Sequence, residues 1–92
     1  MIDSNTLDPH RRLADRQLSL PDLGAPDYAY EAWTRHRDIL YMSGQISRAA
    51  DGQILTGRVG ADATVADAST AAETAALNLL DRIDQAVGLS QV

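Results

Sequence analysis

The longest periodic pattern of apolar residues lies in the last third of the chain. Apolar residues recur there at spacings of three and four, which predicts one amphipathic helix, at Ala68, Ala72, Ala76, Leu79, Leu80, Ile83 and Val87. Thr64 followed by Asp67 is typical of a capping box at a helix start. Gly88 followed by Leu89 is typical of a Schellman-type end. We therefore expect a helix from about Val65 to Val87, with its apolar face on the core.

A two-residue alternation precedes this helix and predicts a β-hairpin. It runs from Tyr28 to Arg35, as expected for a strand with one face on a core and the other partly exposed or at an interface. The apolar run Ile39-Leu40-Tyr41-Met42 predicts a second strand that is buried on both faces, with a turn at His36-Arg37-Asp38. Asp51-Gly52 marks another turn, and a further short strand is expected around residues 53–56.

The N-terminal part of the chain is less regular. Asp8 and Pro9 are typical of an N-cap and a first helical position, so a short helix to about Gln17 is expected. An irregular connector then follows, because the chain is broken by Pro21, Gly24 and Pro26. We therefore divide the sequence into an N-terminal extension, residues 1–27, and part of a single domain, residues 28–92.

Length and composition indicate a small folded protein. The chain has 92 residues, of which 45% are hydrophobic and 23% are charged, so it holds one domain at most and is too apolar to be disordered. It has no cysteine, which excludes a disulfide, a thiolate nucleophile and a cysteine-ligated metal. No basic segment followed by an apolar run occurs at the N-terminus. We expect a soluble cytoplasmic protein.

Charge and histidine placement narrow the choice of partners. The net charge is −5, and the eight basic residues are all arginines spread along the chain, so neither nucleic acid nor membrane is an expected partner. His10 and His36 have no second ligand at metal-binding spacing. The sequence therefore predicts no metal site and no cofactor.

Several short motifs occur together in a characteristic order. They are Tyr30, the strand ending in Ser43-Gly44-Gln45, Asp51-Gly52, Gly57-Arg58-Val59-Gly60 and Asn78-Leu79-Leu80. In order and spacing this set resembles the opening half of RidA/YjgF proteins, the reactive intermediate deaminase or endoribonuclease L-PSP-like family. The leading helix and Leu18-Ser19-Leu20-Pro21 resemble a divergent subgroup of it.

The resemblance implies an α+β fold, a chorismate-mutase-like sheet with helices packed on one face, here lacking the C-terminal part of the fold. It also implies a homotrimer with small-molecule clefts between subunits. Deaminating members hydrolyse small amino-acid-derived 2-imino acids, or the related enamines, to keto acid and ammonia. Their carboxylate-binding arginine and a late acidic residue would lie beyond Val92. Alternatives are a non-catalytic trimeric protein that binds a small carboxylate-bearing metabolite, and an endoribonuclease or translation inhibitor, which the acidic chain without lysine disfavours.

Four residues are carried over as site candidates. Tyr30 matches the site tyrosine, where a phenol can bind a carboxylate or orient water, or it is an ordinary packing residue. Ser43 and Gly44 match the cleft wall, where they bind substrate or simply end the strand. Arg58 is expected either to contact an anion or to be an ordinary surface arginine. Asn78 is expected to hydrogen-bond backbone within the fold.

Overall fold

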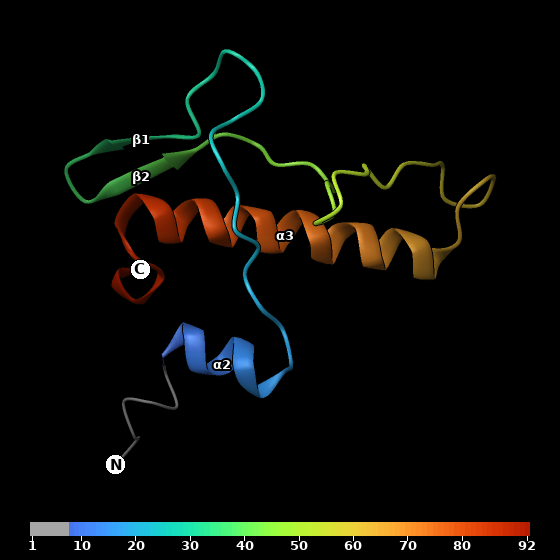
Figure 1. Cartoon of the computed structure of the whole chain (residues 1–92), viewed down its shortest axis with the longest axis horizontal. Helices are drawn as coiled ribbons and strands as arrows, with labels where there is room; N and C mark the ends of the chain where they lie inside the picture. The colour runs from blue at the N-terminus through green and yellow to red at the C-terminus, as the bar shows by residue number, and fades with distance from the viewer. Residues whose placement is uncertain (1–7) are drawn as a thin grey trace.

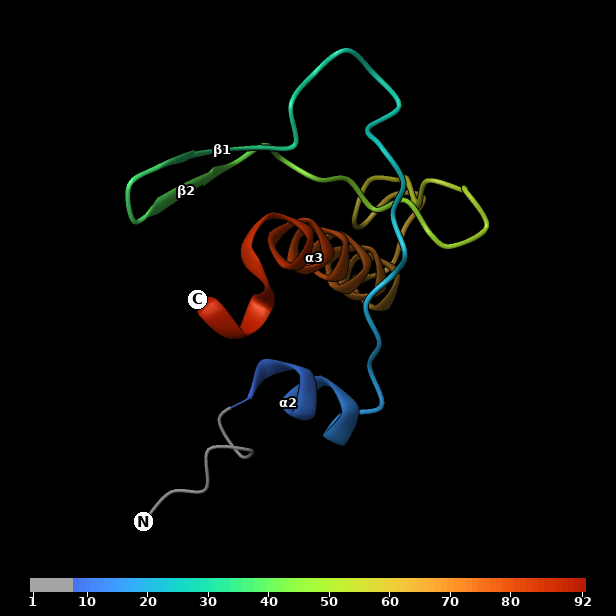
Figure 2. The same ribbon diagram turned by 60° about the vertical axis from the view of Figure 1, so that its left-hand side comes forward.

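The computed structural model describes residues 8–92 and arranges them around one long helix (Figure 1). A hairpin lies over the C-terminal half of this helix, and a short helix lies on its opposite side (Figures 1 and 2). The chain is therefore α+β, as predicted. In chain order the elements are α2 (Pro9–Asp15), β1 (Trp33–His36), β2 (Ile39–Met42), α3 (Val65–Val87) and the 3-10 helix η1 (Leu89–Gln91).

Helix α3 has the predicted bounds. Its capping box is complete, because the Asp67 N–H donates to Thr64 Oγ1 at 3.0 Å and the Thr64 N–H donates to Asp67 Oδ2 at 2.9 Å. At the other end Gly88 has φ 83° and its N–H donates to the Asp84 carbonyl. The Leu89 N–H donates to the Asp84 carboxylate at 2.8 Å. The cap is therefore the single-bond type and not the expected Schellman motif, because a side chain takes the second N–H.

The hairpin is confirmed, but its first strand starts later than predicted. Trp33 pairs with Met42 and His36 pairs with Ile39, with the turn between them. The alternation from Tyr28 does not form strand, and the Tyr30 N–H donates to the Tyr28 carbonyl at 2.8 Å. An N–H used in so tight a turn cannot join a ladder.

Burial of the second strand was predicted wrongly. Ile39 and Tyr41 are both 55% exposed, and only Leu40 and Met42 are half-buried. A two-stranded sheet covered on one side by a helix has a second face open to solvent. The outer face carries alternate residues of both strands.

The strand expected at residues 53–56 is also absent. Ile54 forms a single bridge with Arg48, and the Leu55 N–H donates to the Ser47 carbonyl at 3.0 Å. Ser47 Oγ then donates to the Leu55 carbonyl at 2.7 Å, closing a short loop. The predicted turn at Asp51-Gly52 is confirmed, with Gly52 at φ 88°.

The interior of the described chain is small and partly polar. Ala32 and Leu89 are its buried apolar residues, whereas the buried residues of α3 are Asn78, Asp81 and Arg82. The predicted core face of α3 is only half-buried in its C-terminal half and largely exposed before that. The accessible surface is 7124 Å², against about 5,200 Å² for a compact protein of 9.9 kDa. The apolar stripe therefore lacks the cover that was predicted for it.

Polar side chains of α3 instead hold the connector, which is the irregular chain between α2 and β1. The Leu23 N–H donates to Asp81 Oδ2 at 3.2 Å, and the Leu23 carbonyl accepts from Gln85 Nε2 at 2.8 Å. Arg82 Nη1 donates to the Gly24 carbonyl at 2.6 Å. These bonds satisfy backbone that has no sheet partner.

Helix α2 begins at Pro9, as predicted, and ends before the expected Gln17. Asp8 caps it by accepting from the His10 N–H at 3.1 Å. The helix is attached to the end of α3 and to η1, because His10 Nε2 lies 3.2 Å from Asp84 Oδ1 and Ser90 Oγ in η1 donates to Asp8 Oδ1 at 3.1 Å.

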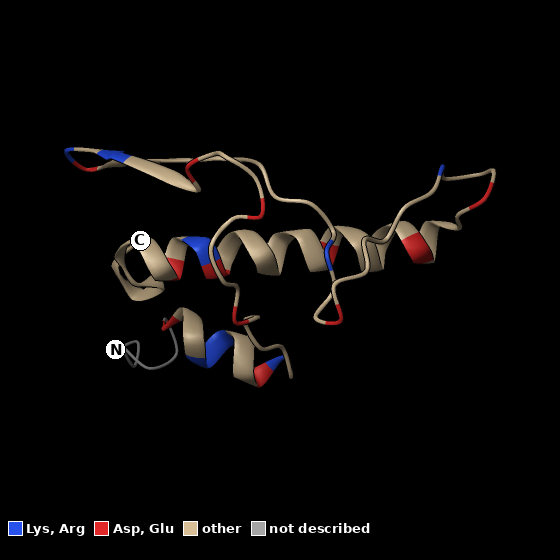
Figure 3. Cartoon of the chain, turned by 45° about the horizontal axis from the view of Figure 1, so that its top comes forward, with Lys and Arg blue, Asp and Glu red and all other residues tan. Residues whose placement is uncertain are grey.

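Charged residues are dispersed over the molecule. Arginines occur on α2, at the hairpin tip, in the loop before α3 and in its C-terminal half, and acidic residues lie among them (Figure 3). Within residues 8–92, no helix combines the length and apolar character needed to cross a membrane.

Candidate functional site

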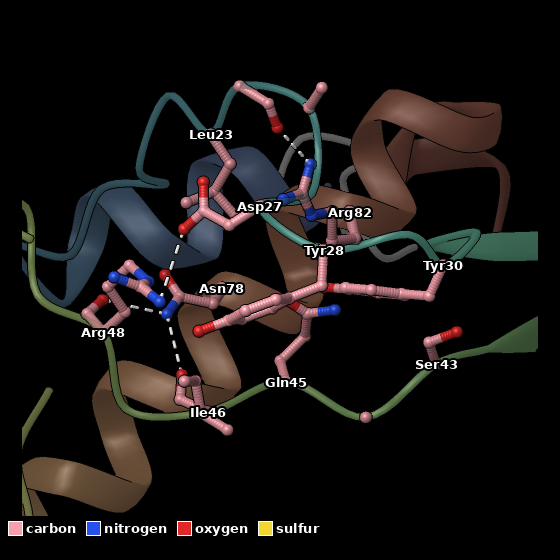
Figure 4. Close-up of a pocket in the computed structure, with 13 residues that line it drawn as sticks. Leu23, Asp27, Tyr28, Tyr30, Ser43, Gln45, Ile46, Arg48, Asn78 and Arg82 are labelled. Atoms are coloured by element: carbon pink, nitrogen blue, oxygen red, sulfur yellow. Dashed lines mark hydrogen bonds and ion pairs between the residues drawn. The ribbon is translucent and has the colours of Figure 1, made fainter.

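A cavity of about 480 Å³ lies between the connector, the segment after β2 (residues 43–48) and the C-terminal half of α3 (Figure 4). This volume suits a small ligand. The cavity is lined by Leu23, Gly24, Ala25, Asp27, Tyr28, Tyr30, Ser43, Gly44, Gln45, Ile46, Arg48, Asn78 and Arg82. Three of the four predicted site residues, Tyr30, Ser43 and Gly44, therefore meet in one place.

Tyr30 is available for contact with a ligand. The residue is 41% exposed, and no hydrogen bond joins its hydroxyl to the other residues that line the cavity (Figure 4). It comes from the connector, just before β1, where the chain bends. A phenol hydroxyl in this position can donate to a carboxylate or hold a water molecule.

Ser43 extends the hairpin beyond its last paired residues. Its N–H donates to the Ala32 carbonyl at 3.0 Å, and its Oγ donates to the Glu31 carbonyl at 2.5 Å. Both hydrogen-bond donors of Ser43 are thus engaged with the chain before β1. The hydroxyl oxygen keeps acceptor capacity toward the cavity.

The backbone geometry of the described chain does not require a glycine at the position of Gly44. Its φ lies outside the left-handed region, and a Cβ placed there would meet nothing within 4 Å. A strand end that needs glycine for its backbone would show a positive φ or a steric conflict. The bare backbone of Gly44 is instead open to the cavity, which favours close approach of a ligand or of another chain.

Arg58 lies outside this cavity, in the loop before α3. Its N–H donates to Asp62 Oδ1 at 2.6 Å, and its carbonyl accepts from the N–H groups of Ala61, Asp62 and Ala63. The backbone of Arg58 therefore organises the loop that leads to the Thr64 cap. The side chain is exposed and does not join the other three candidates.

Asn78 links α3 to the segment after β2 by hydrogen bonds. Its Nδ2 donates to the carbonyls of Ile46 and Arg48, both at 3.0 Å, and the residue is 4% exposed. The expected backbone hydrogen bonding is confirmed.

Sequence reasoning missed several residues of the cavity. Asp27 and Arg48 form an ion pair at 3.3 Å across one side, and Tyr28 lies on the connector. Nothing periodic marks these positions in the sequence. Arg82 had a usable signal, since it follows Asn78 by four residues and so shares a helix face with it.

Metal-ligating side chains do not cluster in the part of the chain that the structure describes. Across residues 8–92, no three His, Cys, Asp or Glu residues come close enough together to hold a metal ion.

Two solved structures resemble the chain closely, although no family model and no curated protein matches it. One is a protein from Shewanella oneidensis described provisionally as an endoribonuclease, with 34% identity and a TM-score of 0.76, covering 87% of this chain and 53% of that one. The other is a protein of unknown function from Agrobacterium tumefaciens, with 32% identity and a TM-score of 0.72, covering 95% of this chain and 51% of that one. The present chain thus spans about half the length of each.

Proposed function

We propose that this chain, a RidA/YjgF-type (endoribonuclease L-PSP-like) protein by its ordered motifs and its structural relatives, contributes one wall of a cleft that hydrolyses small 2-imino acids. The products are the corresponding keto acid and ammonia. The observation that carries the proposal is that Tyr30, Ser43 and Gly44 line a single cavity.

The chemistry requires a held carboxylate and a positioned water. Water adds to the C=N carbon, its oxygen becomes the keto oxygen, and the nitrogen leaves as ammonia with the protons that water supplies. The free hydroxyl of Tyr30 can orient that water, and the Ser43 oxygen can accept a hydrogen bond from the imine nitrogen. The open backbone at Gly44 leaves room for a planar substrate.

Replacement of one hydroxyl tests the proposal. In the complete active protein we expect Tyr30→Phe to lower kcat for 2-iminopropanoate on the order of 10²-fold, because water loses its orienting group. Tyr41→Phe removes the same hydroxyl on the outer sheet face and serves as the control. Turnover unchanged in Tyr30→Phe would return Tyr30 to ordinary packing.

Self-association belongs to the same proposal, with a homotrimer as the expected assembly. Its support is the outer face of the hairpin, where Ile39 and Tyr41 are exposed beside Thr34 and His36. Apolar side chains on an open sheet face favour contact with another copy. We expect Tyr41→Glu to shift the mass measured by sedimentation equilibrium toward the monomer. A wild-type monomer at micromolar concentration would contradict the trimer.

Ligand binding without turnover is the second candidate. It is favoured by the scarcity of free acid–base groups in the cavity. The carboxylate that lines it, Asp27, is already paired with Arg48. No histidine lines this cavity within residues 8–92. A keto acid that raises the melting temperature of a protein without imine hydrolysis would select this candidate.

RNA cleavage is the least supported alternative. The Shewanella protein is described provisionally as an endoribonuclease. The present chain has a net charge of −5, and its arginines are scattered (Figure 3), so no basic track for a phosphate backbone is apparent within residues 8–92. We expect no cleavage of single-stranded RNA when metal ions are chelated.

A further inference from the structure

Within residues 8–92, hydrogen bonds hold the cavity-lining part of the connector only at its two ends. Before it, side chains of α3 bind the backbone of Leu23 and Gly24. After it, Ser43 binds the carbonyls of the two residues that precede β1. Residues 25–30, the 25–30 loop, lie between these fixed points and project from the body of the molecule (Figures 1 and 2). The loop lines the cavity with Ala25, Asp27, Tyr28 and Tyr30.

Backbone hydrogen bonds do not attach the 25–30 loop to its surroundings. Its one backbone bond within the described chain is internal, from the Tyr30 N–H to the Tyr28 carbonyl at 2.8 Å. This tight turn ties the two tyrosines to each other, so they move as a unit. A segment held by few bonds opens at a low cost in free energy.

One ion pair joins the 25–30 loop to the segment after β2. Asp27 Oδ2 lies 3.3 Å from Arg48 Nη2 (Figure 4). Arg48 is a fixed point, because its carbonyl accepts from Nδ2 of Asn78, a residue of α3, at 3.0 Å. The Asp27 side chain is 64% exposed and the Arg48 side chain is 31% exposed. An ion pair this accessible is weak and is screened by salt, so it breaks and forms again readily.

We propose that the 25–30 loop is a lid that opens and closes over the cavity, and that the Asp27–Arg48 ion pair is the latch that holds it shut. Opening withdraws Tyr28 and Tyr30 together, which lets a small molecule enter or leave. The inference goes beyond the proposed function, because it concerns access to the cavity and not the reaction inside it. If Tyr30 has the role proposed above, the latch also determines when the site is complete.

Alkylation of an introduced thiol measures lid opening in the full chain, which has no cysteine of its own. Gln45→Cys places the thiol in the cavity, at a side chain whose amide nitrogen is buried and has no partner among the described residues. Iodoacetamide then reacts in proportion to the open population. Asp27→Asn in this background should raise the rate about two- to fivefold, as expected for loss of an exposed ion pair. Sodium chloride at about 1 M should accelerate alkylation when Asp27 is present and not in Asp27→Asn.

A thiol outside the cavity is the matched control. Leu89 is 5% exposed, lies in η1 and does not line this cavity. In the Leu89→Cys background, Asp27→Asn should leave the alkylation rate unchanged. Equal acceleration at both thiols would mean that the ion pair stabilises the whole fold, and the latch would be overturned.

Reversal of the ion pair tests whether the charges themselves form the latch. Asp27→Arg combined with Arg48→Asp should restore slow alkylation of the Gln45→Cys thiol, because the attraction between the two side chains is rebuilt. A rate as fast as that of Asp27→Asn overturns the ion pair as the latch.

Chymotrypsin covers the case in which Gln45→Cys fails to fold, because it needs no introduced reporter. Tyr28 and Tyr30 lie on the lid, whereas Tyr41 lies on the hairpin. Arg48→Met breaks the latch without changing the sequence around these bonds. It should speed cleavage after Tyr28 and Tyr30 about two- to fivefold and leave cleavage after Tyr41 unchanged. Equal cleavage in the wild type and Arg48→Met overturns the proposal. Neither measurement uses a substrate, so a failure of imine hydrolysis does not affect them.

Discussion

The two halves of α3 carry the same spacing of apolar residues but are covered differently. In the C-terminal half, Asn78, Asp81 and Arg82 are buried beneath the connector and the segment after β2. In the N-terminal half, Ala72 and Ala76 are exposed, and the loop before the helix is the neighbouring segment. The apolar stripe alone does not decide which half is covered.

Unpaired backbone explains the difference. The connector and the segment after β2 belong to no sheet, so their carbonyl and N–H groups need side-chain partners. The C-terminal half of α3 supplies an amide, a carboxylate and a guanidinium. Half of the residues in the N-terminal half are alanine, and no amide or guanidinium occurs among the others. Polar side chains thus position the cavity that the apolar face of the helix cannot position.

The largest effect is expected from removing the amide that joins α3 to the segment after β2. Asn78→Ala should lower the free energy of unfolding by about 2–3 kcal/mol, because two buried carbonyls lose their donor. Ala72→Gln in the N-terminal half is the control and should change stability by no more than about 0.5 kcal/mol. Urea unfolding followed by circular dichroism measures both. Equal losses would erase the contrast between the two halves.

The start of the exposed half should tolerate change better. Thr64→Ala should cost about 1 kcal/mol, because the Asp67 N–H loses its acceptor. Thr64→Ser keeps the hydroxyl and should stay near the wild type. An unchanged melting temperature in Thr64→Ala would show that this end of α3 is frayed in solution.

Acid should weaken the same end of the helix. Hydrogen bonds from Thr64, first from its backbone N–H and then through its side chain, lower the pKa of Asp67 below its ordinary value of 3.8. A lowered folded-state pKa means that this contribution is present above the unfolded pKa and is lost as pH falls through the folded pKa. We expect the melting temperatures of the wild type and Asp67→Asn to converge below pH 3.8. A constant difference down to pH 2 would contradict this.

Local signals predicted the regular elements well. The bounds of α3 follow from Thr64, Asp67 and Gly88, whose effects act within one helical turn. The hairpin follows from the apolar run at Ile39 and the turn before it. Both depend on residues that are close in sequence.

Contacts between distant residues could not be predicted in the same way. The alternation at Tyr28 indicated strand, but strand formation needs a partner that this segment lacks. The burial of Asp81 has no signal in the sequence, because its polarity says nothing about the N–H of Leu23. Tyr30, Ser43 and Gly44, which the family resemblance singled out, line one cavity, and their role there stays a prediction. The position of Arg82 depends on a connector whose path only the structure shows.

The bonds from the connector and the N-cap of α2 to α3 and η1 also bear on the order of events during synthesis. Asp8 bonds Ser90, and Leu23 bonds Asp81 and Gln85, so the partners are separated by 82, 58 and 62 positions. A ribosome delivers roughly 5–20 residues per second, and the earlier segment waits for seconds before its partners emerge. The earlier segment is therefore fixed only after α3 has left the ribosome, and the cavity cannot close before then.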